Sequence, residues 1–158
     1  MCLDQLGAGT VEVRDKTMAH TNREDSMRKE AFCAPTVYTP VRYVQGIKTT
    51  GGTIVWISGQ VSQGKDGKVA HRGDFAGQAR QALANLKAMV EAAGGTIQDI
   101  VKVNTYLTDL RYREELARIR AEFFPDGKLP ASTLVGVAGL ADPDMLVEIE
   151  AVAVIPET

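Results

Sequence analysis

The last ten residues before the C-terminal tail, 146–155, form one long β-type segment without a polar break. Successive side chains of a strand point to opposite faces, so this segment presents two different surfaces. One face is wholly apolar, and the other sets two carboxylates among aliphatic side chains. The apolar face consists of Val147, Ile149, Ala151, Ala153 and Ile155, and the mixed face consists of Leu146, Glu148, Glu150, Val152 and Val154. The apolar face predicts a core position. The mixed face suits a subunit interface that also holds a ligand pocket, and the alternative is a solvated sheet face with scattered valines.

Composition excludes several classes of function. The chain has 158 residues, of which 44% are hydrophobic, which predicts one domain with an ordinary core. The formal net charge of −2 argues against nucleic-acid binding, since such proteins need a basic surface. No apolar run approaches the length of a membrane span, and no secretory signal is visible. We therefore expect a cytoplasmic protein that binds neither nucleic acid nor membrane.

The cysteines and histidines predict neither a disulfide framework nor a metal site. The two cysteines, Cys2 and Cys33, are too few for a disulfide scaffold. The two histidines, His20 and His71, have no second ligand at metal-binding spacing. We expect free thiols in a reducing compartment.

The first 30 residues differ from the rest of the chain. Residues 21–30 are polar and lack a periodic apolar face, which indicates a mobile or loosely docked extension. Met18 and Met27 are alternative starts for the natural chain. The predicted organisation is an extension over residues 1–30 followed by a single domain over residues 31–158.

The remaining pattern predicts an α+β fold. Strands are expected at 41–48 and 53–61, joined by a hairpin-type turn at 49–52, and later at 101–108, 133–139 and 146–155. Helices are expected at 74–93, with Asp74 as N-cap, and around 112–123. The order is therefore β-β-α-β-α-β-β. Each helix has one apolar stripe, so two helices cover one face of a mixed sheet and leave the other face open for oligomerisation.

A series of short segments occurs in a recognisable order along the chain: Tyr43–Gly46, Ile57–Gln60, Gln78–Lys87, Asp99–Val103, Tyr106–Asp109, Phe123–Pro125 and Val147–Ala151. This series resembles the RidA/YjgF family of imine deaminases, also described as L-PSP-type endoribonucleases. The resemblance implies a chorismate-mutase-like fold and a homotrimer with ligand clefts between neighbouring subunits. It also implies hydrolysis of reactive enamines and imines, such as 2-aminoacrylate, to 2-keto acids and ammonia, without a metal or organic cofactor.

Three site residues of this family carry over to the chain. The resemblance places the family's cleft tyrosine at Tyr43, its serine at Ser58 and its water-positioning glutamate at Glu148. Each residue also has a purely structural interpretation. Glu148 could form a hydrogen bond across the subunit interface, Ser58 could form a hydrogen bond to the backbone, and Tyr43 could pack in the interface. Glu150 is expected to be structural. Ser58 has no neighbouring histidine and is not an activated nucleophile.

Two other site residues are replaced. Ser132 stands where the family has the arginine that binds the substrate carboxylate, and Ala117 stands where many members have an asparagine. Because serine carries no charge, we expect weakened activity on 2-aminoacrylate-type acids. Arg42 is a candidate replacement cation. However, neighbouring side chains of a strand point to opposite faces, so if Tyr43 faces the cleft, Arg42 is expected to point away from it.

The sequence thus favours a hydrolase or deaminase that acts on a reactive enamine or imine metabolite. The alternative is a trimer that binds a metabolite without catalysis. An endoribonuclease or translation inhibitor is disfavoured by the charge.

Overall fold

The computed structural model describes residues 27–125 and 128–157, which form two sheets and two α-helices. The strands are β1 (Met27–Phe32), β2 (Gly46–Gly51), β3 (Thr53–Gln60), β4 (Ile100–Leu107), β5 (Ala131–Gly136) and β6 (Val147–Ile155). The helices are α1 (Phe75–Ala92) and α2 (Arg113–Phe123), each preceded or followed by a short 3₁₀ turn, η1 (Ile97–Asp99) and η2 (Leu110–Tyr112). The α+β class with two helices on a mixed sheet is confirmed.

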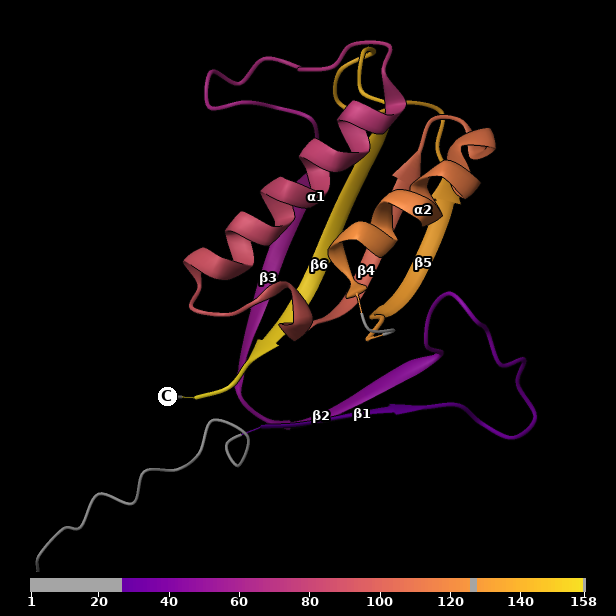
Figure 1. Ribbon diagram of the computed structural model, residues 1–158, viewed down its shortest axis with the longest axis vertical. Helices are drawn as coiled ribbons and strands as arrows, with labels where there is room; N and C mark the ends of the chain where they lie inside the picture. Colours follow the sequence, from indigo (N-terminus) through magenta and orange to yellow (C-terminus); the bar gives the residue numbers. More distant parts are fainter. Residues whose placement is uncertain (1–26, 126–127, 158) are drawn as a thin grey trace, which may run out of the picture.

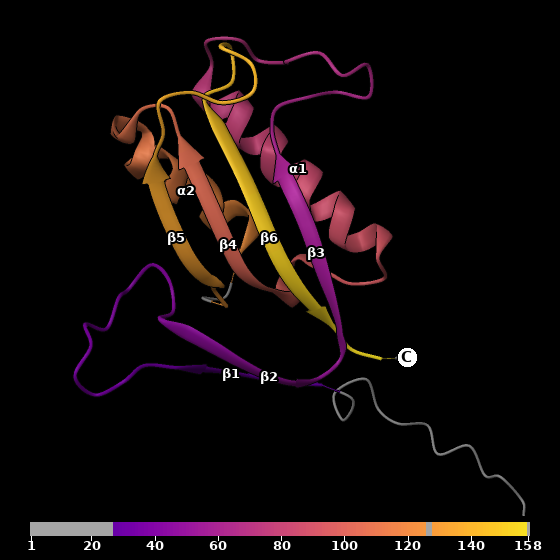
Figure 2. The ribbon, with the colours of Figure 1, turned by 180° about the vertical axis from the view of Figure 1, so that it is seen from behind.

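The main sheet has four strands in the order β3-β6-β4-β5 (Figures 1 and 2). The strand β6 is central: it pairs antiparallel with both β3 and β4, while β5 runs parallel to β4. The alternation predicted for β6 holds up to Ala153, since Val147, Ile149 and Ala151 are at most 5% exposed while Glu148 and Glu150 are only partly covered. It fails at Val154, which was expected on the mixed face but is 3% exposed. The long C-terminal segment therefore organises the sheet.

Both helices lie on the same face of this sheet (Figure 1). Helix α1 begins where predicted, since the side chain of Asp74 accepts a hydrogen bond from the Gly77 N–H, and it buries an apolar stripe against β3 and β6. On this helix Met89 is 48% exposed, and the polar Gln78 is fully buried. The opposite sheet face carries no helix (Figure 2).

The uncovered sheet face is apolar in part. Three large side chains on it face solvent in the single chain: Ile54 is 56% exposed, Trp56 78% and Val135 42%. A tryptophan exposed to this degree beside other apolar side chains is unusual for a surface that stays in water. This face has the character of a surface that another molecule covers.

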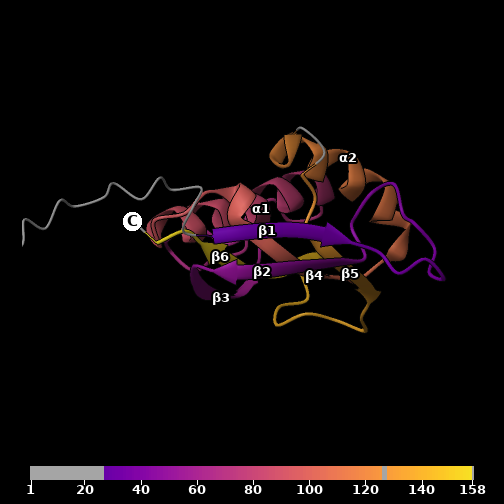
Figure 3. The same cartoon turned by 90° about the horizontal axis from the view of Figure 1, so that it is seen from below.

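The N-terminal part differs from the sequence-based prediction in two ways (Figure 3). Strand β2 does not form a hairpin with β3: it pairs antiparallel with β1 in a separate two-stranded sheet. The chain turns between β2 and β3 at Gly51 and Gly52, both with positive φ, and β3 instead pairs with β6. The predicted hairpin was wrong because the turn at Gly51 and Gly52 leads β2 away from β3 and into a pair with β1.

The end of the predicted extension falls within the described residues. Residues 27–30 lie in β1, whose Met27 pairs with Gly51 and whose Phe32 pairs with Gly46. The Lys29 amine donates a hydrogen bond to the Gln98 carbonyl and ties β1 to the main body. The remainder of the predicted extension, residues 1–26, lies outside the described residues.

Gln78 holds the loop that leads into β6. Its amide donates to the Asp144 carbonyl at 2.7 Å and its oxygen accepts from the Leu146 N–H at 2.9 Å. Both backbone groups belong to the segment just before β6, so one buried side chain sets where that strand begins. The direction of Glu148, two residues later, depends on this anchor.

We predict that Gln78→Met lowers the free energy of unfolding by about 2–4 kcal/mol, because it leaves two backbone groups without partners. Urea unfolding at one protein concentration measures the loss. Gln81→Met is the matched control, since the Gln81 amide bonds only to the Asn85 side chain on the same helix. Equal stability of the two variants would contradict the anchoring role.

Candidate functional site

An irregularity in β3 brings the backbone of that strand against Glu148. Between the paired positions Ile57↔Ala151 and Gln60↔Ile149 the register shifts, so that Ser58 and Gly59 together face a single residue of β6. Such β-bulges re-aim side chains and are common beside active sites. The Glu148 carboxylate lies so close over Gly59 that a Cβ at this position would overlap it. The structure thus brings the Glu148 carboxylate against the Ser58–Gly59 bulge.

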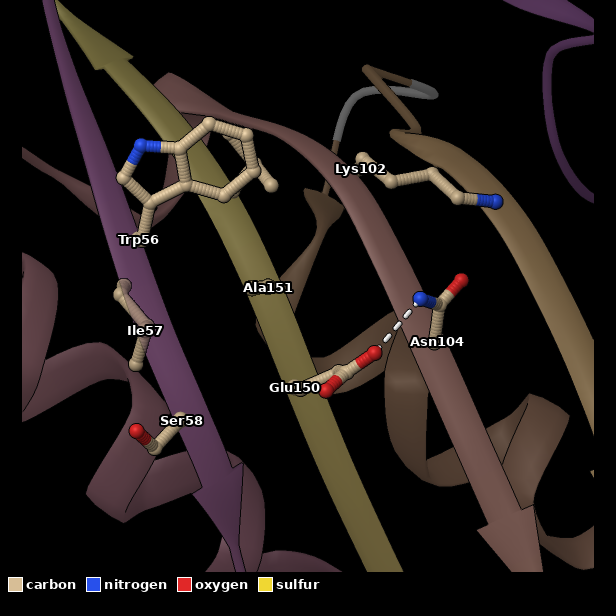
Figure 4. Close-up of a pocket in the computed structure, with 8 residues that line it drawn as sticks. Trp56, Ile57, Ser58, Lys102, Asn104, Glu150 and Ala151 are labelled. Carbon is tan, nitrogen blue, oxygen red and sulfur yellow. Dashed lines mark hydrogen bonds between the residues drawn. The ribbon is translucent and has the colours of Figure 1, made fainter.

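The open face next to this bulge carries a hydrogen-bonded carboxylate. Glu150 accepts from the Asn104 amide at 2.7 Å, the bond drawn in Figure 4, and also from the Tyr106 hydroxyl at 2.9 Å, both across the β6–β4 pair. These two donors hold the pKa of Glu150 below its ordinary value. The same Glu150 bond raises the pKa of Tyr106. Glu150 is therefore held in the structural network that the sequence analysis expected.

A shallow hollow of about 300 Å³ surrounds this network on the open face. It is lined by Trp56, Ile57, Ser58, Lys102, Asn104, Glu150, Ala151 and Val152 (Figure 4). Of the predicted site residues only Ser58 borders it, and Tyr43, Ala117, Ser132 and Glu148 lie elsewhere. The hollow is therefore distinct from the predicted cleft.

A second group of predicted residues gathers at the free edge of β5. Tyr43 precedes Val44, which forms a parallel bridge with Ala131, so Tyr43 lies near Ser132 at the start of β5. The predicted strand over 41–48 is reduced here to this bridge and β2. Tyr43 and Ser132 are both partly covered. Ala117 lies on α2, one helical turn before the residue that reaches Ser132.

That residue is Arg120, which the sequence analysis missed. Its guanidinium Nη1 donates to the Ser132 Oγ at 3.1 Å, and desolvation lowers the pKa of Arg120. A signal was present in the sequence. Arg120 follows Leu116 by four residues and precedes Phe123 by three, which places a cation on the apolar stripe of the helix.

One chain cannot bring both groups to a single small ligand. Ser132 on β5 pairs with Val103 on β4, and Val103 pairs with Ala151 on β6. Val103 and Ala151 are both buried on the helix side of the sheet, so Ser132 lies on that side too. Glu148 points to the opposite face of β6, which is two strands from β5, and it lies three residues along β6 from Ala151. The backbone separation is roughly 14 Å, from two strand spacings and three residue rises. The candidate site is therefore in two halves: the Glu148 half on β6 and β3, and the Ser132 half on β5 and α2.

Other candidate groups are placed as follows. Arg42 forms an exposed ion pair with Glu114, with 2.7 Å between Nη1 and Oε2, in agreement with its expected position away from the cleft. Within residues 27–125 and 128–157, no group of three or more His, Cys, Asp or Glu side chains is arranged to hold a metal ion. No helix in the same segments is long and apolar enough to cross a membrane.

Comparison with known proteins gives a consistent result. The model of the family described as Endoribonuclease L-PSP matches residues 34–155. A RutC family protein of Pyrococcus horikoshii is 40% identical over 112 residues, which cover 70% of this chain and 85% of that protein.

Solved structures agree with the sequence comparison. The crystal structure of YyfB from Yersinia pestis, a protein of unknown function of the conserved Rid family, superposes with a TM-score of 0.72 at 31% identity, covering 80% of this chain and 98% of that one. RidA from the Antarctic bacterium Psychrobacter sp. PAMC 21119 superposes with a TM-score of 0.60 at 35% identity, covering 79% and 94% respectively.

We predict that Tyr106→Phe raises the pKa of Glu150 toward its ordinary value of 4.5, because one of two donors is lost. A carboxyl whose pKa is lowered by folding stabilises the native state above its unfolded pKa, and this contribution disappears as the pH falls through the folded pKa. The stability gap between wild type and variant should thus be full above about pH 5 and narrow toward about pH 3.

Carboxyl NMR titration and urea unfolding across this range measure both quantities. Tyr38→Phe, at an exposed tyrosine, is the control. A gap of constant size down to the lowest pH would contradict the assignment of the shift to Tyr106.

Proposed function

Because the chain belongs to the endoribonuclease L-PSP family, which includes the RidA/YjgF proteins, we propose that it hydrolyses a small reactive enamine or imine. The reaction takes place in a cleft between copies of the chain and uses no metal or organic cofactor. The observation that carries the proposal is the Glu148 carboxylate, held over the Ser58–Gly59 bulge at the rim of an uncovered sheet face.

The proposed assembly is a homotrimer. Two features support an assembly that covers the open face. Ile54, Trp56 and Val135 are exposed in the single chain, and their burial would remove apolar surface from water. The two halves of the candidate site lie on opposite faces of the sheet, so a neighbouring copy has to supply one half. Three copies in a ring give three equivalent clefts of this kind.

Glu148 acts as the general base in this proposal. It takes a proton from a water molecule while the water oxygen attacks the carbon of the protonated C=N bond. The resulting tetrahedral intermediate carries a hydroxyl and an amino group on the same carbon. Glu148 then returns the proton to the nitrogen. As the C–N bond breaks, the hydroxyl passes its proton back to the Glu148 carboxylate, and ammonia leaves a carbonyl compound behind. An enamine enters the same sequence after its tautomerisation to the imine.

Ser58 and Tyr43 orient the substrate. The Ser58–Gly59 bulge presents backbone groups and a hydroxyl beside Glu148, where they can bond to the substrate or to the attacking water. Tyr43 contributes its ring from the Ser132 half of the cleft, where an aromatic face can pack on a small planar C=N group. Neither residue takes part in proton transfer.

The charge distribution weighs against ribonuclease action. The net charge is −2, and the polar part of the open sheet face includes the carboxylates of Glu148 and Glu150. Single-stranded RNA binding requires a basic groove with aromatic stacking platforms. A trimer that binds a metabolite without turnover differs from the proposed enzyme only in the role of Glu148, and the next experiment separates the two.

We predict that wild-type protein accelerates the decay of 2-iminobutanoate, generated in situ, to 2-oxobutanoate and ammonia. Glu148→Gln should lower this rate by about 10²–10⁴-fold while the fold is retained, because the amide cannot accept the proton. Gly59→Ala should also lower it, because the added methyl displaces the carboxylate. Ammonia release measures the rate.

Glu91→Gln, at an exposed glutamate on α1, is the matched control and should behave as wild type. If wild type leaves the imine decay unchanged but still binds small ligands, the metabolite-binding alternative holds. Equal rates for wild type and Glu148→Gln would remove Glu148 from the mechanism.

A further inference from the structure

Arg120 is a largely buried arginine for which no ion pair is found within the described residues. Arg42, Arg72, Arg80 and Arg111 each pair with a carboxylate on the surface. Arg120 is largely buried between α2 and β5. Its only hydrogen bond within residues 27–125 and 128–157 goes to the neutral Ser132, at 3.1 Å, and its Nη2 is buried without a partner in the same segments.

A buried guanidinium without an anion is energetically costly. Removing an ion from water costs several kcal/mol unless opposite charge or hydrogen bonds compensate it, and most buried polar atoms in folded proteins are satisfied. Desolvation accordingly lowers the pKa of Arg120, and no nearby carboxylate raises it again. An anion that arrives beside this group would be attracted in a medium of low dielectric constant.

The position of Arg120 determines where such an anion would bind. The guanidinium reaches Ser132, the position where the family resemblance implies an arginine that binds the substrate carboxylate. We propose that the Arg120–Ser132 pair replaces that arginine and makes this half of the cleft a binding site for a small carboxylate. The inference rests on the proposed function for the location of the cleft. It assigns the positive charge that attracts the carboxylate to Arg120 on α2 instead of to a residue on β5.

The hydrogen bond explains how a neutral serine can bind an anion. Because Ser132 Oγ accepts from Arg120, its own hydroxyl hydrogen is free to point elsewhere and can donate to a carboxylate oxygen. The positive charge behind the hydroxyl polarises it and strengthens that donation. Ser132 is partly exposed on the outermost strand of the main sheet, next to the Val44–Ala131 bridge, which leaves part of its surface accessible to a ligand. Ser132 is thus the contact residue, and Arg120 is the positioning residue that supplies charge.

The alternative is that Arg120 only fastens α2 to β5. That role requires a polar partner on β5, which Ser132 supplies, but it does not require a full positive charge in a buried position. The two roles make different predictions. A fastening role changes stability alone, whereas a binding role changes the preference between a carboxylate and its neutral amide.

The test is to compare the binding of pyruvate and pyruvamide, which have the same shape and differ in charge, by NMR titration of wild type and variants. Wild type should prefer pyruvate. Arg120→Met, which keeps an apolar stem of similar length, should lose about tenfold or more in pyruvate affinity with little change for pyruvamide. Arg118→Met, at an exposed arginine two residues earlier on the same helix, is the matched control and should keep the preference.

Thermal unfolding and light scattering show whether Arg120→Met folds, and three further variants accompany it, two of which keep Arg120 or a lysine in its place. Ser132→Ala removes the hydroxyl and should lose the preference. Arg120→Lys keeps a positive charge and should retain part of it. The double variant Arg120→Met with Ser132→Arg restores a cation by the other route and should recover pyruvate binding.

The inference is overturned if wild type binds neither compound, or if Arg120→Met and Ser132→Ala bind pyruvate as wild type does. Its outcome is separable from that of the proposed reaction. Pyruvate binding that depends on Arg120 in a protein without imine hydrolysis supports the inference while the reaction fails. Hydrolysis that depends on Glu148, with pyruvate affinity unchanged in all variants, supports the reaction and overturns the inference.

Discussion

The structure depends on the opposite requirements of the two faces of β6. One face packs against α1 and buries Val147, Ile149 and Ala151 almost completely, which fixes the register of the sheet, because a one-residue slip would expose all three. The other face then necessarily presents Glu148 and Glu150 on the side without helices. Glu150 is satisfied within the chain by Asn104 and Tyr106, whereas Glu148 lies over the bulge in β3. The same alternation that builds the core thus places a carboxylate where a neighbouring molecule can complete a site.

The proposed cleft has its two charges in different halves. The carboxylate of Glu148 serves the C=N carbon, and the guanidinium of Arg120 serves the acid group through Ser132. If both charges came from one face of one chain at close range they would form an ion pair and neutralise each other, as Arg42 and Glu114 do on the surface. Placement on opposite faces keeps both available until two copies meet. This separation gives a physical reason why the activity would require assembly.

Local patterns allowed prediction of α1, its cap at Asp74 and the alternation of β6, because these depend on spacing along the chain. Pairing of β2 with β1 instead of β3 could not be predicted, since the choice rests on competition among strands far apart in sequence. Gln78 lies in one of the segments that resemble the family, but its hydrogen bonds to Asp144 and Leu146 could not be predicted, because these residues are far from it in the sequence. Arg120 could not be predicted from the residue at position 132 alone, because its charge comes from the neighbouring helix α2 and the two residues meet only in the folded chain.

The central claim is that each cleft takes Glu148 from one copy and Arg120 with Ser132 from another. Mixing subunits tests it directly: Glu148→Gln and Arg120→Met proteins are unfolded together, refolded as mixed oligomers, and assayed for 2-iminobutanoate hydrolysis. Random mixing in equal amounts leaves both halves intact in roughly one cleft in four. Two parent proteins that are each weakly active should therefore give a mixture with about a quarter of wild-type activity. A mixture whose mass confirms assembly but whose activity stays at the mean of the two parents would show that each chain acts with its own two halves, and would contradict the account.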